Sequence, residues 1–571
     1  MPYLIQQKSP RSVLVSAVAL SLLLAAPFAG AGDPPGAEPV PAVAPAAAPE
    51  AAVAPAANAQ QFWQGQIDLQ AAKLDFVTRF TPGAEGQPTT GSIDIPMQGI
   101  NGAMLKDITL TAPKAAEGGG EAAASPGGMV FTFTFPGAPD AVFTMVLDAA
   151  DANKATGTIA QMGQSFPVTM SRLKEGEAPK GPDRPQHPRP PFPYEVGEMK
   201  FPGGKDAEGK EISLAGTITL PKEGGPFPGV ILVSGSGPQD RDETLLGHKP
   251  FFVLADALTR AGIAVLRYDD RGVGASTGTF ETASTDDFVD DAAAALKALA
   301  VQPNIDPKRV GIIGHSEGGL IAPIVAARTE GVAFLVLMAG TGLNGKDTLK
   351  SQLAAIQRAG GMPEEMIAAM TEAQQSLLQL VIDNAAPEQV SGAMRKLMAM
   401  QQGVVAPTPE QIASIPEEMV QNGLSGLNSP WMKRFLVLDP RESLRKITAP
   451  VLAINGELDT QVIASIHLPE IGKALDEAGN KDVTTLGVNG VNHLFQTATT
   501  GSPTEYASIT ETINPGVLTK ITSWVRQRTG LEPMPAPSEP KPAAEPPAAP
   551  GAAPGGEPEP VKLPEKKGEG D

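Results

Sequence analysis

Short runs in which apolar and polar residues alternate fill the chain between residues 60 and 173. Examples are FWQGQIDL, FTFTF and AVFTMVL, and turns that contain glycine or aspartate separate them. A period of two residues is typical of strands with one buried face. The pattern predicts six to eight short antiparallel strands in a small all-β domain, either a sandwich or a barrel.

From about residue 196 the pattern changes to apolar runs that alternate with helical segments. The runs cover residues 228–235, 263–270, 309–316, 334–340, 450–456 and 483–488. Strands that alternate with helices predict a mainly parallel sheet with helices on both faces. Residues 211–221, EISLAGTITLP, predict an antiparallel strand that enters this sheet.

The alternation stops between about residues 344 and 446, where amphipathic helices rich in Met, Leu and Gln follow one another. A helical insertion of this size between two strands predicts a lid, with a purely structural excursion as the alternative. Its methionines fit either an adaptable apolar pocket or the core between helices. They are Met366, Met370, Met394, Met398 and Met400.

The N-terminus predicts export. Lys8 and Arg11 precede an apolar run, and the small-residue sequence Ala29-Gly30-Ala31 follows it. This is the pattern of a cleaved signal peptide over residues 1–31, and the short apolar core without a basic stop-transfer segment argues against a membrane anchor. We expect a periplasmic or extracellular protein with no stable membrane span after cleavage.

Segments rich in proline separate and flank the predicted domains. Residues 32–59 form a Pro/Ala-rich segment, residues 174–195 a Pro-rich hinge, and residues 531–571 a Pro/Ala/Glu-rich tail. Such compositions lack an apolar face to bury, so we expect linkers at 32–59 and 531–571 without a packed core.

Charge and cysteine content exclude several classes of function. The formal net charge of −19 argues against a nucleic-acid partner, because nucleic-acid-binding proteins present a basic face to the phosphates. The chain has no cysteine, which excludes disulfides and thiolate catalysis.

The sequence GIIGHSEGG, residues 311–319, places Ser316 between an apolar strand and a helical segment. A serine on such a turn is held out at the carboxyl edge of a sheet, and glycines two residues before and after it remove clashing Cβ atoms. The helix N-terminus adds backbone donors nearby. This context favours a nucleophile over a structural turn.

A serine nucleophile needs a base, and His493 is the best-placed histidine. It lies in GVNGVNHLF, a loop after the last predicted strand, where it can reach the carboxyl edge of the sheet. The other histidines fit a hinge (His187), loop packing (His248), a side chain directed away from the serine (His315) and a helix surface (His467).

Asp459 is the expected partner of His493, because it follows the strand PVLAING and a tight turn; Glu457 is the alternative. The chain order Ser316, Asp459, His493 is that of α/β-hydrolases. A developing oxyanion also needs donors, for which we expect the backbone N–H groups of Glu317 and Ser236, with Gly237 as the next choice.

Several motifs together resemble the α/β-hydrolase superfamily, especially its bacterial secreted esterase and serine-aminopeptidase-like branch. They are VSGSGPQDRDE, LADALTRAGIAVLRYDDRGVGAS, GIIGHSEGG, PVLAINGELD and the final Asn-His pair, and they span roughly residues 196–530. The resemblance implies an α/β-hydrolase fold and a Ser-Asp-His hydrolase without metal or organic cofactor. It also implies that Asp270 and Arg271 anchor loops and are not catalytic.

The preferred hypothesis is an exported carboxylesterase acting on a small-molecule acyl ester. A peptidase, an amidase or a thioesterase on the same three residues is the alternative, and a binding or wall-associated protein is a third reading. The polar residues Gln239 to Asp242 fit either substrate contacts or a solvated loop.

Overall fold

The computed structural model describes residues 60–68, 73–83, 88–95, 100–112, 127–134, 140–161, 164–174 and 184–532. The predicted signal peptide (1–31), the linker (32–59) and all but the first two residues of the tail (531–571) lie outside the described residues. Within the described ranges, none of the helices combines the length and the apolar character that crossing a bilayer requires.

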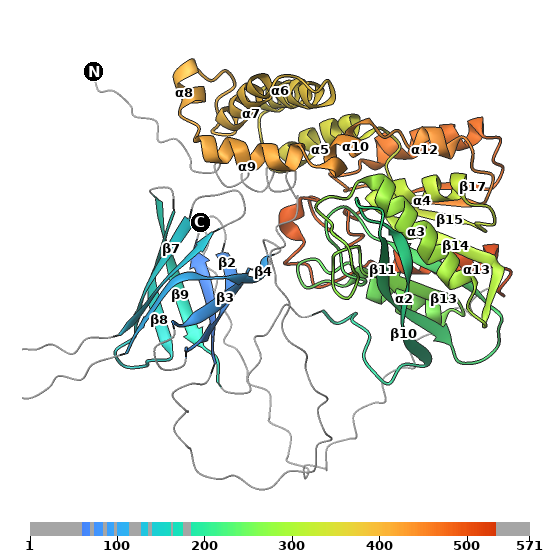
Figure 1. Ribbon diagram of the computed structural model, residues 1–571, viewed down its shortest axis with the longest axis horizontal. Helices are drawn as coiled ribbons and strands as arrows, with labels where there is room; N and C mark the ends of the chain where they lie inside the picture. The colour runs from blue at the N-terminus through green and yellow to red at the C-terminus, as the bar shows by residue number, and fades with distance from the viewer. Residues whose placement is uncertain are drawn as a thin grey trace, which may run out of the picture. The chain divides into compact units, whose positions relative to one another are not determined.

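The N-terminal domain is one antiparallel sheet of nine strands in the order β4-β3-β2-β1-β9-β8-β7-β6-β5 (Figure 1). Sheet neighbours are consecutive in the chain, apart from β1 and β9. The predicted all-β character is confirmed, but the expected six to eight strands are too few. The strands are Gln61–Asp68 (β1), Lys73–Thr81 (β2), Thr90–Ile95 (β3), Ile100–Met104 (β4), Lys106–Thr111 (β5), Gly128–Thr134 (β6), Asp140–Leu147 (β7), Lys154–Gln161 (β8) and Gln164–Arg172 (β9).

This sheet curls around a single core. Leu105, between the two end strands β4 and β5, donates its N–H to the carbonyl of Gly91 in β3 at 2.9 Å. Aromatic rings fill the interior: Phe131 stacks on Phe143 with 4.6 Å between ring centroids, and Phe76 meets Phe143 at 5.5 Å. The large aromatic rings on one face therefore pack together inside a single sheet that closes on itself. They do not lie between two sheets.

The second domain has an eight-stranded sheet in the order β10-β11-β13-β12-β14-β15-β16-β17. The six strands β12 to β17 pair in parallel, and β10 and β11 pair antiparallel at one edge. The predicted parallel sheet and its antiparallel entry strand are confirmed. The strands are Tyr194–Lys205 (β10), Glu211–Pro221 (β11), Phe227–Val233 (β12), Ala264–Tyr268 (β13), Ile305–His315 (β14), Leu335–Met338 (β15), Val451–Gly456 (β16) and Val483–Val488 (β17).

Helices cover both faces of this sheet (Figure 1). One core contains the inner faces of α2 (Pro250–Arg260) and α13 (Pro515–Arg528). The opposite core contains those of α3 (Thr285–Ala300), α4 (Glu317–Arg328) and α12 (Ala464–Glu477). The parallel strands β12, β13, β15 and β16 are buried along their whole length, and β14 is buried over its apolar half, residues 310–315.

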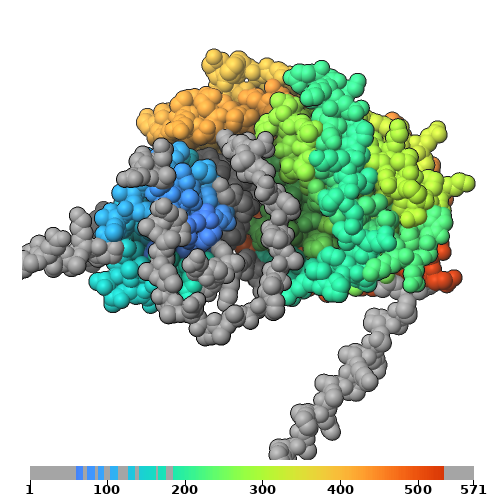
Figure 2. Space-filling model, turned by 60° about the horizontal axis from the view of Figure 1, so that its bottom comes forward, coloured from blue at the N-terminus to red at the C-terminus, as the bar shows by residue number. Residues whose placement is uncertain are grey.

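Seven helices lie between β15 and β16, where the sequence predicts a helical insertion. Residues 409–424, PEQIASIPEEMVQNGL, whose pattern predicts one helix, form two, because Pro416 separates α8 from α9. Helix α8 has no buried residue, and the yellow to orange helices of this insertion lie at the surface in Figure 2. The five methionines are buried, so they form helix core. The helices are Gly345–Ala359 (α5), Glu364–Ile382 (α6), Pro387–Met400 (α7), Pro409–Ala413 (α8), Glu417–Leu427 (α9), Pro430–Val437 (α10) and Arg441–Leu444 (α11).

The second half of the predicted hinge is fixed to the second domain. Arg184 donates to the carbonyls of Ile509, Leu246 and Ala507 at 2.5, 2.9 and 3.0 Å. Gln186 donates to the carbonyl of Ile513 at 2.7 Å. Because these contacts bury Arg184, residues 184–193 are part of the domain surface, and β10 begins at Tyr194.

The turn from β14 into α4 is packed too tightly for side chains at two positions. A Cβ at Gly314 would overlap the carbonyl of Gly318, and a Cβ at Gly318 would overlap the carbonyl of Val233 in β12. The missing side chains therefore allow β12, β14 and α4 to meet at Ser316.

We predict that Gly318→Ala destabilises the protein by about 3 kcal/mol or prevents folding, because the new methyl group must displace packed backbone. Gly392→Ala is the control: Gly392 lies within α7 with no atom within 4 Å of the added Cβ. There, alanine should stabilise by up to about 1 kcal/mol. Urea unfolding measures both, and a Gly318→Ala protein as stable as the wild type would contradict the packing described.

Candidate active site

Ser316 stands on a strained turn between β14 and α4. Its backbone angles are φ 54° and ψ −114°, a left-handed conformation that side-chain-bearing residues rarely adopt. The Ser316 N–H donates to the carbonyl of Met338 at the end of β15, at 2.8 Å. This bond fixes the turn to the neighbouring strand at the carboxyl edge of the sheet.

The structure brings His493 and Asp459 to Ser316. His493 Nε2 lies 3.2 Å from Ser316 Oγ, and His493 Nδ1 lies 2.8 Å from Asp459 Oδ2. The other Asp459 oxygen accepts the N–H groups of Gln461 and Val462 at 2.7 and 2.8 Å. Glu457, the alternative carboxylate, is exposed to solvent.

The loop that carries His493 is held by the buried side chain of Asn492. Its Oδ1 accepts the N–H groups of Leu494 and Gln496 at 3.1 and 2.9 Å, and its Nδ2 donates to Gln496 Oε1 at 3.0 Å. Leu458, beside Asp459, donates its N–H to the carbonyl of Val491 at 2.9 Å. The loops after β16 and β17 are therefore joined next to the histidine and the carboxylate.

The glycine-rich loop after β12 passes directly beside Ser316. An added Cβ on Gly235 would lie 3.2 Å from Ser316 Cβ. The Gly235 N–H already donates to Glu243 Oε1 at 2.7 Å. Within the described part of the chain, the N–H groups of Ser236 and of Glu317 have no acceptor. Both predicted oxyanion donors are thus unpaired.

Asp270 ties the two ends of this loop together. Its Oδ1 accepts the Ser234 hydroxyl at 3.1 Å, and its Oδ2 accepts the Gln239 N–H at 3.0 Å. Arg271 instead pairs with the buried Asp291 at 2.7 Å. Both residues therefore anchor loops, as the resemblance implied, although they do not pair with each other.

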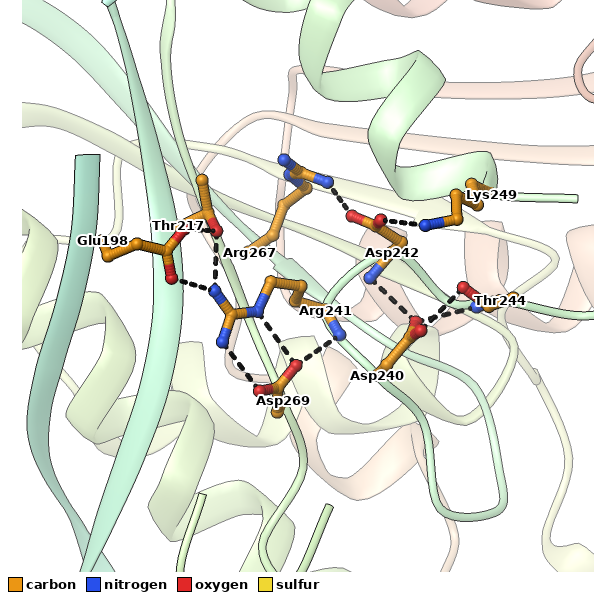
Figure 3. Close-up of polar contacts among 9 residues, drawn as sticks. All are labelled: Glu198, Thr217, Asp240, Arg241, Asp242, Thr244, Lys249, Arg267 and Asp269. Carbon is orange, nitrogen blue, oxygen red and sulfur yellow. Dashed lines mark hydrogen bonds and ion pairs between the residues drawn. The ribbon is translucent and has the colours of Figure 1, made fainter. Parts of the chain in front are cut away.

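The side chains of residues 240–242 form hydrogen bonds and ion pairs with other residues of the second domain (Figure 3). The guanidinium of Arg241 donates to both oxygens of Asp269, at 3.0 and 2.8 Å. Asp242 forms an ion pair with the buried Arg267, and Asp240 accepts the Asp242 N–H at 3.0 Å. These contacts fix the loop to the end of β13, so a solvated loop is the wrong interpretation for this cluster.

The side chain of Glu317 is buried under the helical insertion. Its Oε1 accepts the Thr285 hydroxyl at 2.9 Å and the indole N–H of Trp431 in α10 at 2.7 Å. Burial raises the pKa of Glu317 to about 7, although both hydrogen bonds oppose the shift. A carboxyl that titrates near neutral pH therefore follows Ser316 directly.

Two other histidines are buried structural groups. His248 Nδ1 lies 3.0 Å from Thr512 Oγ1 and its Nε2 lies 3.0 Å from the carbonyl of Tyr506, consistent with loop packing. His467 has no exposed surface and its Nδ1 accepts the Gly342 N–H at 2.9 Å, so its predicted place on a helix surface is wrong. Burial lowers the pKa of both histidines to about 4.

Sequence reasoning missed the buried contacts of Glu243, His315 and Trp431. Glu243 lies one residue beyond the polar cluster, and its neighbours in the sequence give no sign that it turns inward. His315 and Trp431 reach partners more than seventy residues away in the chain. Local patterns carry no information about pairs at such separations.

The raised pKa of Glu317 predicts that this group lowers stability as pH rises. The folded protein keeps the proton up to about pH 7, whereas the unfolded chain releases it near 4.5. Over this pH range the free energy of unfolding therefore falls by about 3 kcal/mol. Glu317→Gln removes the titration, so urea unfolding between about pH 4.5 and about pH 8 should show the wild type losing stability relative to the variant. Parallel pH dependences would contradict this assignment.

Comparisons of the sequence with known proteins find a family and several relatives similar to this chain. Residues 249–396 match the family described as serine aminopeptidase, S33. Esterase EstD of Thermotoga maritima is 27% identical over 58% of this chain and 70% of its own length. Human acyl-coenzyme A thioesterase 1 is 30% identical over 24% of this chain and 29% of its length.

Among solved structures, an esterase of Pyrococcus furiosus aligns with a TM-score of 0.34 at 16% identity, over 62% of this chain and 98% of that one. The assignment itself depends on the sequence matches, on the eight-stranded sheet and on the strand–Ser316–helix turn. The chain therefore has an α/β-hydrolase fold, with a match to the serine aminopeptidase family over residues 249–396 and an esterase among its sequence relatives.

Proposed function

We propose that this protein is an exported serine hydrolase that cleaves carboxylic esters. The observation that carries the proposal is the hydrogen-bonded series from Ser316 Oγ through His493 to Asp459, with distances of 3.2 and 2.8 Å. A buried imidazole between a hydroxyl and a carboxylate is the arrangement that makes serine a nucleophile. Export depends on residues 1–31 of the sequence.

The proposed reaction proceeds through an acyl-enzyme. Ser316 Oγ attacks the acyl carbon while His493 Nε2 takes its proton. The ester C–O bond then breaks, and His493 returns the proton to the leaving alcohol. Water, deprotonated by His493, attacks the acyl-enzyme and releases the acid. Asp459 holds Nδ1 protonated throughout, because its carboxylate accepts that N–H.

The oxyanion is proposed to lie between the Glu317 N–H and the Ser236 N–H. Support comes from the close approach of Gly235 to Ser316, which brings the next residue to the nucleophile. Support also comes from the position of Glu317 as the first residue of α4, where a backbone N–H has no intrahelical partner.

Ester cleavage is preferred because esterase EstD is matched over 58% of this chain, against 24% for acyl-coenzyme A thioesterase 1. Thioester cleavage on the same residues is the second candidate, favoured by the match to acyl-coenzyme A thioesterase 1. A peptidase would hold the free amino group of its substrate with carboxylates. Glu364 and Glu417, acids at the starts of α6 and α9, already pair with Arg358 and Arg395.

Ser316→Ala should lower kcat for short p-nitrophenyl esters by about 10⁴-fold or more, because the attacking hydroxyl is removed. The matched control is Ser376→Ala, since Ser376 is exposed in α6 and bonds only to the carbonyl of Glu372 at 2.9 Å. Steady-state kinetics of the two variants measures the effect. Turnover of Ser316→Ala within a few fold of the control would overturn the proposal.

The leaving group is identified by comparing an oxygen ester, a thioester and an aminoacyl amide of the same acyl group. The proposal expects the oxygen ester to have the highest kcat/KM, relative to its uncatalysed hydrolysis. A higher relative value for the thioester would support the second candidate, and one for the amide would support a peptidase.

The helices between β15 and β16 are proposed to form a lid. Support comes from α10, which contacts two elements beside the nucleophile: Trp431 donates to Glu317, and Arg434 pairs with Asp286 of α3 at 2.6 Å. Phe435 stacks on Trp431 with 5.5 Å between ring centroids. Movement of α10 would therefore be transmitted to the residue after Ser316.

Trp431→Phe keeps the aromatic ring but removes the hydrogen bond to Glu317, which is worth about 1–3 kcal/mol. We expect faster hydrogen exchange in α10 and an altered ratio of kcat/KM between long-chain and short-chain esters. Trp524→Phe is the control, because the buried Trp524 indole N–H has no hydrogen-bond partner among the residues that the structure describes. If both variants leave exchange and chain-length preference unchanged, the lid role is wrong.

A further inference from the structure

Glu243 joins two segments of the proposed catalytic apparatus through one carboxylate oxygen. Its Oε1 accepts the Gly235 N–H at 2.7 Å and lies 2.8 Å from His315 Nδ1. Gly235 precedes the proposed oxyanion donor, and His315 precedes the proposed nucleophile. The side chains of Glu243 and His315 are only 6% and 7% exposed, so water cannot replace these contacts.

The second ring nitrogen of His315 reaches the residue proposed as the base. His315 Nε2 lies 3.0 Å from the backbone carbonyl oxygen of His493. The two rings lie 5.0 Å apart between centroids. The His315 imidazole therefore contacts the backbone of His493. Because His315 is the last residue of β14, this contact joins His493 to the strand that leads into Ser316.

Both partners of His315 can only accept hydrogen bonds. A carboxylate oxygen faces Nδ1 and a carbonyl oxygen faces Nε2, so both contacts form only when both nitrogens carry protons. Burial disfavours the charged ring, but the charge and hydrogen bond of Glu243, the His493 carbonyl and the charge of Asp459 together raise the pKa of His315 above its usual value. The ring is therefore an imidazolium beside a carboxylate.

The loop network next to Glu243 holds it in this position (Figure 3). Arg241 and Asp242 fix the preceding residues to β13, as described above. Thr244 donates its N–H and its hydroxyl to Asp240 at 3.0 and 2.7 Å. Glu243 itself has a φ of 52°, an unfavourable conformation that persists only because its surroundings impose it.

We propose that Glu243 and His315 form a buried ion pair that positions the oxyanion loop and the His493 backbone relative to Ser316. The inference rests on the proposed function, since it assigns these residues to the same active site. Neither residue touches the reacting atoms. They are positioning residues, and they act through the Gly235 N–H and the His493 carbonyl.

The Glu243–His315 ion pair predicts that activity falls as the pH rises and His315 loses a proton. When His315 loses a proton, the neutral ring can donate to only one of its two partners, so either Glu243 or the His493 carbonyl is released. The charged or titratable groups facing His315 are Glu243 and, on the loops after β16 and β17, Asp459 and His493. Removing the Glu243 charge should move this loss to lower pH by about one unit or more.

Glu243→Gln, His315→Gln and the double variant test the proposal. Each single change should lower kcat for p-nitrophenyl esters by about 10–100-fold, with KM changed far less. The double variant should lose no more than the worse single variant, because the residues act as one unit. Additive losses, or an alkaline limb of kcat/KM that stays in place in Glu243→Gln, would overturn it.

Asp256→Asn is the matched control for the change of carboxylate to amide. Asp256 accepts from Tyr194 and Arg260, at 2.8 Å each, on the outer side of α2. This variant should retain kcat and the pH profile. If Ser316→Ala keeps its turnover, the proposed function fails; if Ser316 is required but folded Glu243→Gln behaves as this control does, only the positioning role fails.

If the variants fail to fold, a measurement on the unmodified protein tests the proposal instead. The chain has five histidines, so selective ¹⁵N labelling gives a simple spectrum of ring nitrogens. As the pH rises, one ring should keep protons on both nitrogens after the other histidine rings have become neutral. A spectrum in which no ring keeps both protons longer than the others would overturn the proposal.

Discussion

The backbone of Ser316 is the constraint on which the proposed active site depends. Its left-handed conformation is imposed from outside, because the glycines on either side of it let β12, β14 and α4 approach without side chains. The bond from its N–H to the carbonyl of Met338 then fixes the turn to the sheet. Strain of this kind persists only where packed backbone imposes it, and here it presents the hydroxyl to the loops after β16 and β17.

Three buried carboxyl groups surround this turn, and their partners give them different roles. Asp459 accepts two backbone N–H groups and the His493 ring. Glu243 faces a histidine that needs a second proton to satisfy its contacts, whereas Glu317 faces only neutral donors and its pKa rises to about 7. A buried charge is stable only with a partner, so the identity of the partner decides which carboxyl stays ionised.

Much of this architecture is predictable from the sequence. Buried parallel strands are continuous apolar runs, and the chain order of Ser316, Asp459 and His493 led us to expect the proximity that the structure has. The edge strand β10 and the split at Pro416 are less predictable, because their patterns are short or irregular. The contacts of Glu243, His315 and His467 are not predictable, since burial of a polar side chain depends on partners distant in the chain.

Labelling with a fluorophosphonate, followed by mass spectrometry of the digested protein, is the most direct test of the account. Such a probe reacts with a serine only where a base and oxyanion donors activate it. The account predicts one adduct, on the peptide that contains Ser316, which disappears when His493 is replaced by alanine. The absence of an adduct, or an adduct on another serine, would contradict it.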